Sequence, residues 1–292
     1  MPAITLDPLI HLEDLDIQNM YSLTENELIQ LFNESSVSRK KFQYLKKLSL
    51  PRYATDNIIA LISRSTYSLK LTCLNLSSCS SITNRTVIFI TKYMHNLIEL
   101  NLSYCLNITD FALFGIPIKT NEKLIDWLDE QEIRKQFIND LISLSPTIFK
   151  YSEIHDQQVC HCTQINVSSK CAYLTLDYSK KSSFESILSI LTNNQLFLKY
   201  FHPIKKLKQL KRLYLKQCIQ LTDLILFYAL EFPTLEILDL SYCELLTDKY
   251  LHLIGENNPC LELINIINCR NISEYGEEQL KMNAKRLKLF ED

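Results

Sequence analysis

Residues 235–248 read LEILDLSYCELLTD, a stretch of the form L-x-x-L-x-L-x-x-C-x-x-L-T-D. Nearly the same form occurs at four more places in the chain, beginning at Leu71, Leu97, Leu210 and Leu261. Neighbouring copies start 26 residues apart (71 to 97), 25 apart (210 to 235) and 26 apart (235 to 261). Self-similarity at a fixed period of this length indicates a repeat architecture.

Each part of this form predicts a local structure. The L-x-x-L-x-L half alternates apolar residues with others, as in a short strand whose leucines point into a core. Thr-Asp then offers side-chain oxygens that can cap a helix. Apolar pairs such as Val87 with Ile90, or Leu251 with Ile254, have the spacing of that helix. Neighbouring strand–helix units must stack, because one unit cannot bury its apolar side alone.

The repeats therefore predict an α/β leucine-rich-repeat solenoid, a horseshoe with parallel strands on its concave face and helices on its convex face. We expect a single domain over residues 1–292. After the copy at Leu97 the register breaks, and helical apolar spacing near 117–147 predicts a helical insertion. The repeats are clear over 45–116 and 210–283 and degenerate over 12–34 and 148–209.

Composition limits the classes of function. The formal net charge is −2 and the isoelectric point about 6.3, so the chain has no basic field for nucleic acid. No apolar run reaches the roughly 18 residues of a transmembrane helix. Residues 1–8 lack the basic and apolar regions of a signal peptide. We expect a cytoplasmic or nuclear chain with neither nucleic acid nor membrane as a partner.

The chain has ten cysteines, and their positions guide their interpretation. Five of them occupy one position of the five copies, as expected of a small, mostly buried packing residue. In a chain that is not secreted, free thiols are the expected state, and a disulfide framework is the alternative. These five are Cys79, Cys105, Cys218, Cys243 and Cys269.

Catalytic motifs are missing from the sequence. A Gly-rich phosphate loop or dinucleotide fingerprint needs several glycines close together, and the chain has three in all. Neither G-x-S-x-G nor H-E-x-x-H occurs. We therefore expect a chain that is not an enzyme, with no catalytic residue and no cofactor.

One cluster allows a rival hypothesis. Cys160-His161-Cys162, with His155 before it and Cys171 after it, contains enough soft ligands for zinc. However, C-x-C is not the usual C-x-x-C pair, and no second pair follows at a suitable distance. We interpret these residues as thiols of a degenerate repeat and expect no metal site. A metal-binding protein or enzyme centred on 155–171 is the rival.

The pattern also predicts a binding surface, because the residues between the leucines point outward from the strands. Tyr and Arg often supply hot spots in interfaces, and the mixed charge of these positions favours a protein partner over a polyanion. The alternative is that many of them are ordinary surface residues. The candidate binding residues are Glu99, Asn101, Tyr104, Arg212, Tyr214, Lys216, Asp239, Tyr242 and Asn265.

The ending of the repeat resembles a known family. Cys79–Asn84, Cys105–Asp110, Cys218–Asp223 and Cys243–Asp248 share C-x-x-I/L-T-D/N, whereas the general leucine-rich consensus prefers Asn in the Cys position. This ending is similar to that of the cysteine-containing F-box/leucine-rich-repeat proteins and the related antagonist-of-mitotic-exit proteins.

The resemblance implies a function in protein degradation. In that family the repeats hold a protein substrate while an F-box docks on Skp1 in a cullin ubiquitin ligase. It implies substrate recognition in an SCF-type ubiquitin ligase, leading to proteasomal degradation. No F-box is recognisable here, and the single Trp is Trp127. A regulatory leucine-rich-repeat adaptor that works without a cullin is therefore the alternative.

Overall fold

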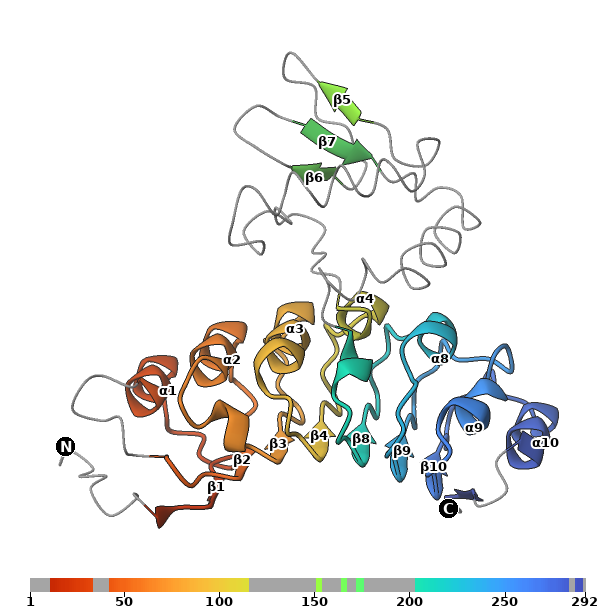
Figure 1. Cartoon of the computed structure of the whole chain (residues 1–292), viewed down its shortest axis with the longest axis horizontal. Coiled ribbons are helices and arrows are strands. Elements are labelled where there is room, and N and C mark those ends of the chain that lie inside the picture. The colour runs from red at the N-terminus through yellow and green to blue at the C-terminus, as the bar shows by residue number, and fades with distance from the viewer. Residues whose placement is uncertain are drawn as a thin grey trace. The chain divides into compact units, whose positions relative to one another are not determined.

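The computed structural model describes residues 11–33, 42–115, 151–153, 164–166, 172–175, 203–283 and 287–290. By its internal contacts the chain divides into two units (Figure 1). Unit 1 comprises residues 1–116 and 202–292, and unit 2 comprises residues 117–201.

Unit 1 contains one parallel sheet of eight short strands. Their order in the sheet is β1-β2-β3-β4-β8-β9-β10-β11, so every described repeat adds its strand beside that of the preceding repeat. The α/β class and the parallel pairing predicted from the sequence are confirmed. The strands are β1 (Asp14–Asp16), β2 (Lys47–Ser49), β3 (Cys73–Asn75), β4 (Glu99–Asn101), β8 (Arg212–Tyr214), β9 (Ile237–Asp239), β10 (Leu263–Asn265) and β11 (Lys288–Leu289).

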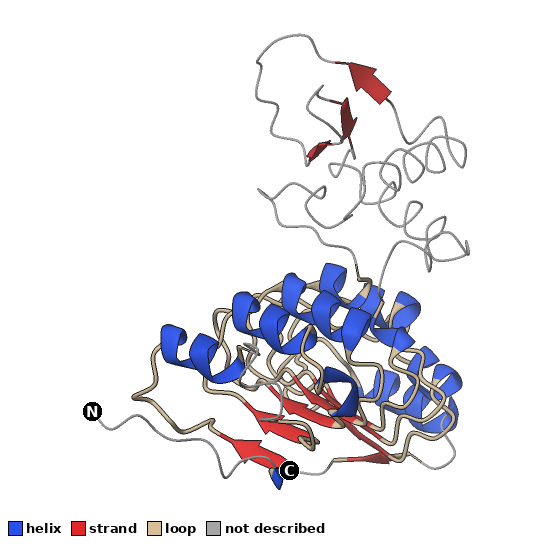
Figure 2. Ribbon diagram, turned by 60° about the vertical axis from the view of Figure 1, so that its left-hand side comes forward, coloured by secondary structure: helices blue, strands red, loops and turns tan. Residues whose placement is uncertain are grey.

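The described helices of unit 1 lie on one side of this sheet, as Figures 1 and 2 show. Each α-helix follows a strand and a turn, as the apolar spacing of the sequence predicts, whereas the short 3₁₀ helices η2 and η4 precede β3 and β8. The predicted degenerate repeat over 12–34 forms such a unit from β1 and α1. The helices are α1 (Glu25–Phe32), α2 (Asp56–Ser63), η2 (Ser68–Lys70), α3 (Asn84–Tyr93), α4 (Asp110–Leu113), η4 (Ile204–Lys206), α8 (Leu224–Tyr228), α9 (Leu253–Asn257) and α10 (Glu274–Asn283).

The core consists of inward leucines and isoleucines between the sheet and the helices. In β2 to β4 and β8 to β10 the central residue is buried and its neighbours are at least partly exposed, because successive side chains of a strand point to opposite faces. Burying one such side chain contributes about 1.5–3 kcal/mol. The fully buried strand positions include Leu48, Leu74, Leu100, Leu213, Leu238 and Ile264.

The repeated cysteines join neighbouring repeats, as well as filling the core. The Sγ of Cys105 donates a hydrogen bond to the carbonyl of Leu76 at 3.2 Å, in the preceding repeat. Cys79, Cys218, Cys243 and Cys269 make the same bond to the repeat before them. All seven cysteines within the described part of the chain are free thiols, so the packing interpretation of the five repeated cysteines is confirmed.

The Thr-Asp pairs join repeats in a way that the sequence did not reveal. The oxygens of Asp223 accept hydrogen bonds from the backbone N–H (2.7 Å) and hydroxyl (2.6 Å) of Thr247, one repeat later. The expected cap, a Thr hydroxyl accepting from the helix backbone, is present at Thr83 and absent at Thr109. The aspartate therefore mainly ties each helix start to the next repeat.

One such link connects the two parts of unit 1. Asp110, at the start of α4, accepts hydrogen bonds from the N–H (2.8 Å) and hydroxyl (2.6 Å) of Thr222. Burial raises the pKa of Asp110 to about 6. The equivalent residue one repeat earlier is Asn84, which bonds to the N–H and hydroxyl of Thr109.

The single solenoid over 1–292 stays a prediction; in the described residues, the middle of the chain adds no strand to the parallel sheet. β4 pairs directly with β8, so no strand from the segment between them in sequence separates them in the parallel sheet. In unit 2 the described strands β5 (Tyr151–Glu153), β6 (Gln164–Asn166) and β7 (Ala172–Thr175) form an antiparallel sheet of order β5-β7-β6.

The described strands β5 to β7, within the degenerate repeats predicted over 148–209, pair with one another and not with the parallel sheet. Alternating apolar residues predict a strand but do not fix its partner or direction. The segment after Leu176 also has no Cys followed by Thr-Asp, the residues that tie one repeat to the next. The helical insertion predicted near 117–147 lies outside the described residues.

Candidate protein-binding surface

The strand face is the side of the unit 1 sheet that points away from the helices. The first and third residues of each strand triplet lie on it, and the register aligns them in two rows. The first row is Asp14, Lys47, Cys73, Glu99, Arg212, Ile237 and Leu263. The second row is Asp16, Ser49, Asn75, Asn101, Tyr214, Asp239 and Asn265. Six of the nine predicted binding residues lie on these rows, and the other three, Tyr104, Lys216 and Tyr242, lie in the turns that follow the strands.

Three of the predicted binding residues have a structural role. The side-chain oxygens of Asn101, Asp239 and Asn265 accept hydrogen bonds from the backbone N–H two residues later, at 2.9 to 3.1 Å. Asp16 and Asn75 do the same. Such bonds close the turn after a strand, as Asn and Asp commonly do. The recurrence of Asn or Asp in one position was the sequence signal for this role.

Two strands depart from that pattern. In β2 the third residue is Ser49, and Pro51 follows two positions later without an N–H to bind. In β8 the third residue is Tyr214, whose phenol cannot close the turn in this way. Tyr214 is therefore not required by the hydrogen bonding that the other repeats use.

Glu99 and Arg212 neutralise each other. Nε and Nη2 of Arg212 lie 2.8 and 2.7 Å from one oxygen of Glu99, across the β4–β8 pair. The hydrogen bond to Glu99 raises the pKa of Arg212. This ion pair fastens together the two strands that flank the central segment in sequence, so these two charges are already used within the fold.

Tyr104 and Tyr242 occupy the same turn position, directly before the repeated Cys. Their φ angles are 63° and 61°, in the left-handed region, which costs a non-glycine residue of the order of 1 kcal/mol. Each backbone N–H donates to the next repeat, Tyr104 to the carbonyl of Lys216 (2.7 Å) and Tyr242 to that of Ile267 (2.9 Å). These bonds offset the strain, and the two residues remain 39% and 38% exposed.

Lys216 lies between these two rings. Its Nζ is 5.7 Å from the ring centroid of Tyr104 and 5.1 Å from that of Tyr242, within the range of cation–π attraction. No carboxylate in the described residues lies within ion-pair distance of Lys216. We call Tyr104, Lys216 and Tyr242 the Tyr–Lys cluster.

Exposed apolar side chains follow the cluster along the same three turns. Leu106 is 40%, Ile219 43% and Leu245 51% exposed. They come two or three residues after Tyr104, Lys216 and Tyr242 respectively. We call these three residues the apolar rim. A neighbouring arrangement of aromatic, cationic and apolar groups is typical of protein interfaces.

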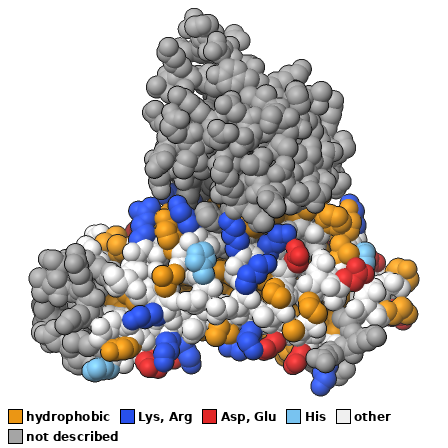
Figure 3. Space-filling model, viewed as in Figure 1, with side chains coloured by type: hydrophobic (Ala, Val, Ile, Leu, Met, Phe, Trp, Pro, Cys, Tyr) orange, Lys and Arg blue, Asp and Glu red, His pale blue; other side chains and the backbone are white. Residues whose placement is uncertain are grey.

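Charges elsewhere on the repeats are mixed in sign, and some of them form ion pairs. Figure 3 shows basic and hydrophobic side chains interspersed with acidic ones over the repeats on the side it displays. Such a surface has no field of one sign that would favour a polyanion. The described ion pairs beside that of Arg212 are Lys46–Glu13, Lys47–Asp14, Lys205–Glu231 and Lys211–Glu236.

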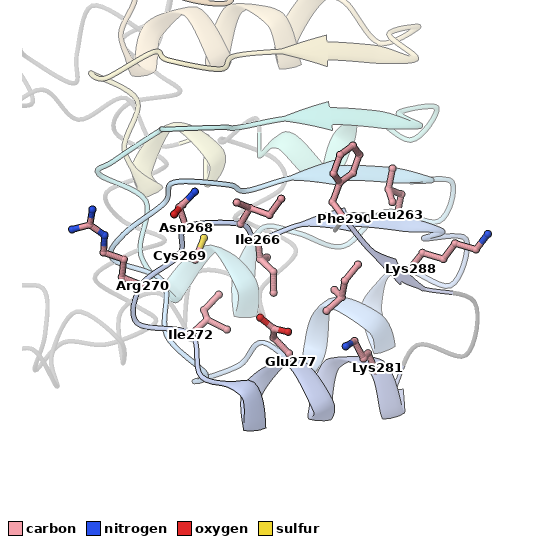
Figure 4. A pocket seen from close by; sticks show the side chains of 12 residues that line it. Leu263, Ile266, Asn268, Cys269, Arg270, Ile272, Glu277, Lys281, Lys288 and Phe290 are labelled. Atoms are coloured by element: carbon pink, nitrogen blue, oxygen red, sulfur yellow. The ribbon is translucent and has the colours of Figure 1, made fainter. Parts of the chain in front are cut away.

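A cavity of about 960 Å³ opens at the last described repeat (Figure 4). It is lined by Leu263 and Cys269 of the β10 repeat, Glu277 and Lys281 of α10, and Phe290 beside β11. β11 has two residues and covers only the start of β10. The sequence could not predict this cavity because it depends on the length of that strand.

The cysteine chemistry does not favour metal binding in the repeats. Burial raises the pKa of Cys79 and Cys243 to about 12 and that of Cys269 to about 11, whereas a metal needs the thiolate. In the described ranges no group of three or more His, Cys, Asp or Glu residues could hold a metal ion.

The rival zinc hypothesis, on Cys160, His161, Cys162, His155 and Cys171, falls on residues outside the described part and stays a prediction. A zinc measurement on the purified chain tests it. Among the helices that the structure describes, none has the length and apolar character to cross a membrane.

Comparisons with known proteins give no family. No family model matches the chain, and no curated protein matches it. A solved structure that it resembles is the crystal structure of the Rad7 and Elc1 complex in yeast, with 18% sequence identity and a TM-score of 0.39. The match covers 81% of this chain and 44% of that chain, so the chain spans less than half of it.

Proposed function

We propose that the chain is a non-enzymatic protein-interaction module. Its unit 1 would be a leucine-rich-repeat horseshoe that holds a protein partner on a concave strand face. One observation carries this proposal: the β8 and β9 repeats place Tyr214, Lys216 and Tyr242 outward, where the stacking of repeats does not require them. Exposed aromatic and basic groups with no role in the fold are expected where a partner binds.

We further propose that the partner is a substrate of an SCF-type ubiquitin ligase, bound for proteasomal degradation in the cytoplasm or nucleus. The support is the repeated Cys and Thr-Asp ending of the F-box/leucine-rich-repeat type. Cys105 and Asp110 use that ending to join repeats, which gives a physical reason for its recurrence. Skp1 and cullin components would then be further partners.

Affinity purification of the tagged chain from eukaryotic cells tests both proposals, that the strand face binds a protein and that the chain acts in an SCF-type ubiquitin ligase. The proposal predicts specific protein partners, which the double variant Tyr214→Ala/Tyr242→Ala loses. The matched control, Ser49→Ala/Ser77→Ala, changes outward residues of β2 and the β3 turn and should retain them. If both variants keep every partner, the strand face is not the binding surface.

The second candidate is a regulatory adaptor that acts without a cullin. It is favoured by the lack of any recognisable F-box in the 292 residues. Both candidates use the same strand face, so they differ only in the associated proteins. Skp1 among the purified proteins supports the ligase, whereas partners without Skp1 support the adaptor.

A further inference from the structure

We propose that the Tyr–Lys cluster binds an acidic peptide segment of the partner, in which an Asp or Glu is flanked by large apolar residues. The Lys216 ammonium would donate to the carboxylate, and the apolar rim would contact the flanking side chains. The inference rests on the proposed function and adds the chemistry of the partner to it.

The first argument is that Lys216 has no carboxylate partner among the residues that the structure describes. Near it in unit 1, Lys211 and Arg212 each have a carboxylate partner, Glu236 and Glu99. Lys216 instead faces two aromatic rings, which attract a cation but do not neutralise it. An ammonium has three N–H donors, and a carboxylate is the protein group that complements both its charge and its donors.

The second argument is that the ammonium is held in position. Tyr104 and Tyr242 come from the repeats on either side of Lys216, and their backbones are fixed by hydrogen bonds to the next strand. Figure 1 shows β4, β8 and β9 side by side, in the order of the sheet. A flexible lysine that is already restricted loses less conformational entropy when a ligand binds.

The third argument compares each residue with its equivalents in the other repeats. Where β8 has Lys216, the corresponding residues after β3, β4 and β9 are Ser77, Ser103 and Ser241. The chain can thus build this turn with a small hydroxyl residue. The long, positively charged side chain of Lys216 is therefore not needed to form this turn.

Leu245 of the apolar rim departs from its equivalents in the same way. Asn107, Gln220 and Asn271, at this position in other repeats, donate a side-chain hydrogen bond to the carbonyl of Ser80, Leu106 and Glu244 in the preceding repeat. Leu245 cannot donate such a bond, and it is half exposed. Its apolar surface is therefore available to a bound partner.

A selection with a displayed library of random dodecapeptides on the full-length chain tests the inference. Selected peptides are synthesised with a fluorescent label, and their Kd values are measured by anisotropy. We expect peptides with Asp or Glu beside Leu, Ile or Phe. Lys216→Met keeps the apolar stem and removes the charge, so it should weaken binding about tenfold or more, as expected for a lost charge-assisted hydrogen bond.

The matched control is Lys211→Met, which removes a cation already paired with Glu236 and should change Kd by about twofold or less. Tyr242→Asn serves as a second variant, because Asn268 occupies the same left-handed position in the next repeat, and it should also weaken binding. Replacing the peptide's Asp or Glu by Asn or Gln should abolish the difference between wild type and Lys216→Met.

Three results overturn the inference. The first is a selection that yields neutral or basic peptides. The second is equal binding of acidic peptides to wild type and Lys216→Met. The third is a single-stranded oligonucleotide that binds more tightly than the peptides and depends on Lys216 for binding. If peptides or protein partners bind at another part of the strand face, the inference fails and the proposed function stands. If neither peptides nor proteins bind the chain, both fail.

Discussion

The strand face consists of two parts that share one scaffold and differ in their outward residues. From β1 to β4 the outward positions are mainly small and polar, such as Ser49, Asn75 and Asn101. From β8 to β10 they include Tyr214 and Ile237, with Lys216 and Tyr242 in the turns, and Tyr104 in the turn after β4 completes the Tyr–Lys cluster. The inward leucines, the cysteine thiols and the carboxylate links are alike in both parts. The difference therefore does not arise from the formation of the fold, and we propose that it concerns binding.

The largest expected effect concerns the shared scaffold. Leu74→Ala in β3 and Leu238→Ala in β9 each remove a fully buried side chain, which should lower the unfolding free energy by about 2–5 kcal/mol. Because the two positions are equivalent, the two losses should be similar. Urea unfolding followed by circular dichroism measures them. A much smaller loss at Leu238 would mean that the later repeats are packed differently.

The link between the two parts should depend on pH through Asp110. Its pKa is raised from 3.8 to about 6 in the folded chain, so the folded state binds more protons than the unfolded state between these values. The stabilisation is complete below the unfolded pKa and is lost as the pH rises through about 6. From pH 7 to pH 5 the stability of wild type should therefore rise by about 1 kcal/mol relative to Asp110→Asn.

Asp110→Asn should itself fold, because Asn84 makes the equivalent link one repeat earlier. Unfolding at both pH values is measured for wild type, Asp110→Asn and the control Asn84→Ala, which adds no titratable group. An equal pH dependence in wild type and Asp110→Asn would contradict this account of the link.

A smaller effect is expected for the ion pair between Glu99 and Arg212. A double-mutant cycle with Glu99→Gln and Arg212→Gln should give a coupling free energy of about 0.5–1 kcal/mol, because both side chains are about one-third exposed. The coupling should decrease in high salt. A coupling near zero would mean that this pair does not fasten β4 to β8.

The smallest effect on stability is expected where the effect on binding is large. Tyr104→Asn and Tyr242→Asn place a residue that tolerates the left-handed region at exposed positions, so stability should change by about 0.5 kcal/mol or less. Binding of the partner should nevertheless decrease for both. Large losses of stability would mean that these tyrosines belong to the fold, like Asn101 and Asn265.

The sequence predicted the scaffold of unit 1 because one pattern recurs there. The period of the repeat predicted where strands occur, and the alternation predicted inward positions such as Leu213 and Leu238. The shared position of Cys243 and its equivalents indicated that these cysteines are packing residues. In the middle of the chain, alternation at Leu174 and Leu176 indicates a strand but not its neighbour. Pairing depends on contacts between residues far apart in sequence.

The candidate site could be predicted only in part. The alternation correctly turns Tyr214 and Lys216 outward, but the direction of a side chain does not tell whether it binds a partner or its own backbone. Asn101, Asp239 and Asn265 bind their own backbone. The placement of Lys216 between Tyr104 and Tyr242 depends on which strands are neighbours across a gap of 112 residues, from Tyr104 to Lys216.

Amide hydrogen exchange of the full-length chain, alone and with its purified partner, tests the central claim most directly. The account predicts that the partner slows exchange over residues 212–219 and 237–245, and leaves residues 47–53 and 73–78 unchanged. Protection confined to the helices, or equal protection of both parts of the strand face, would contradict it.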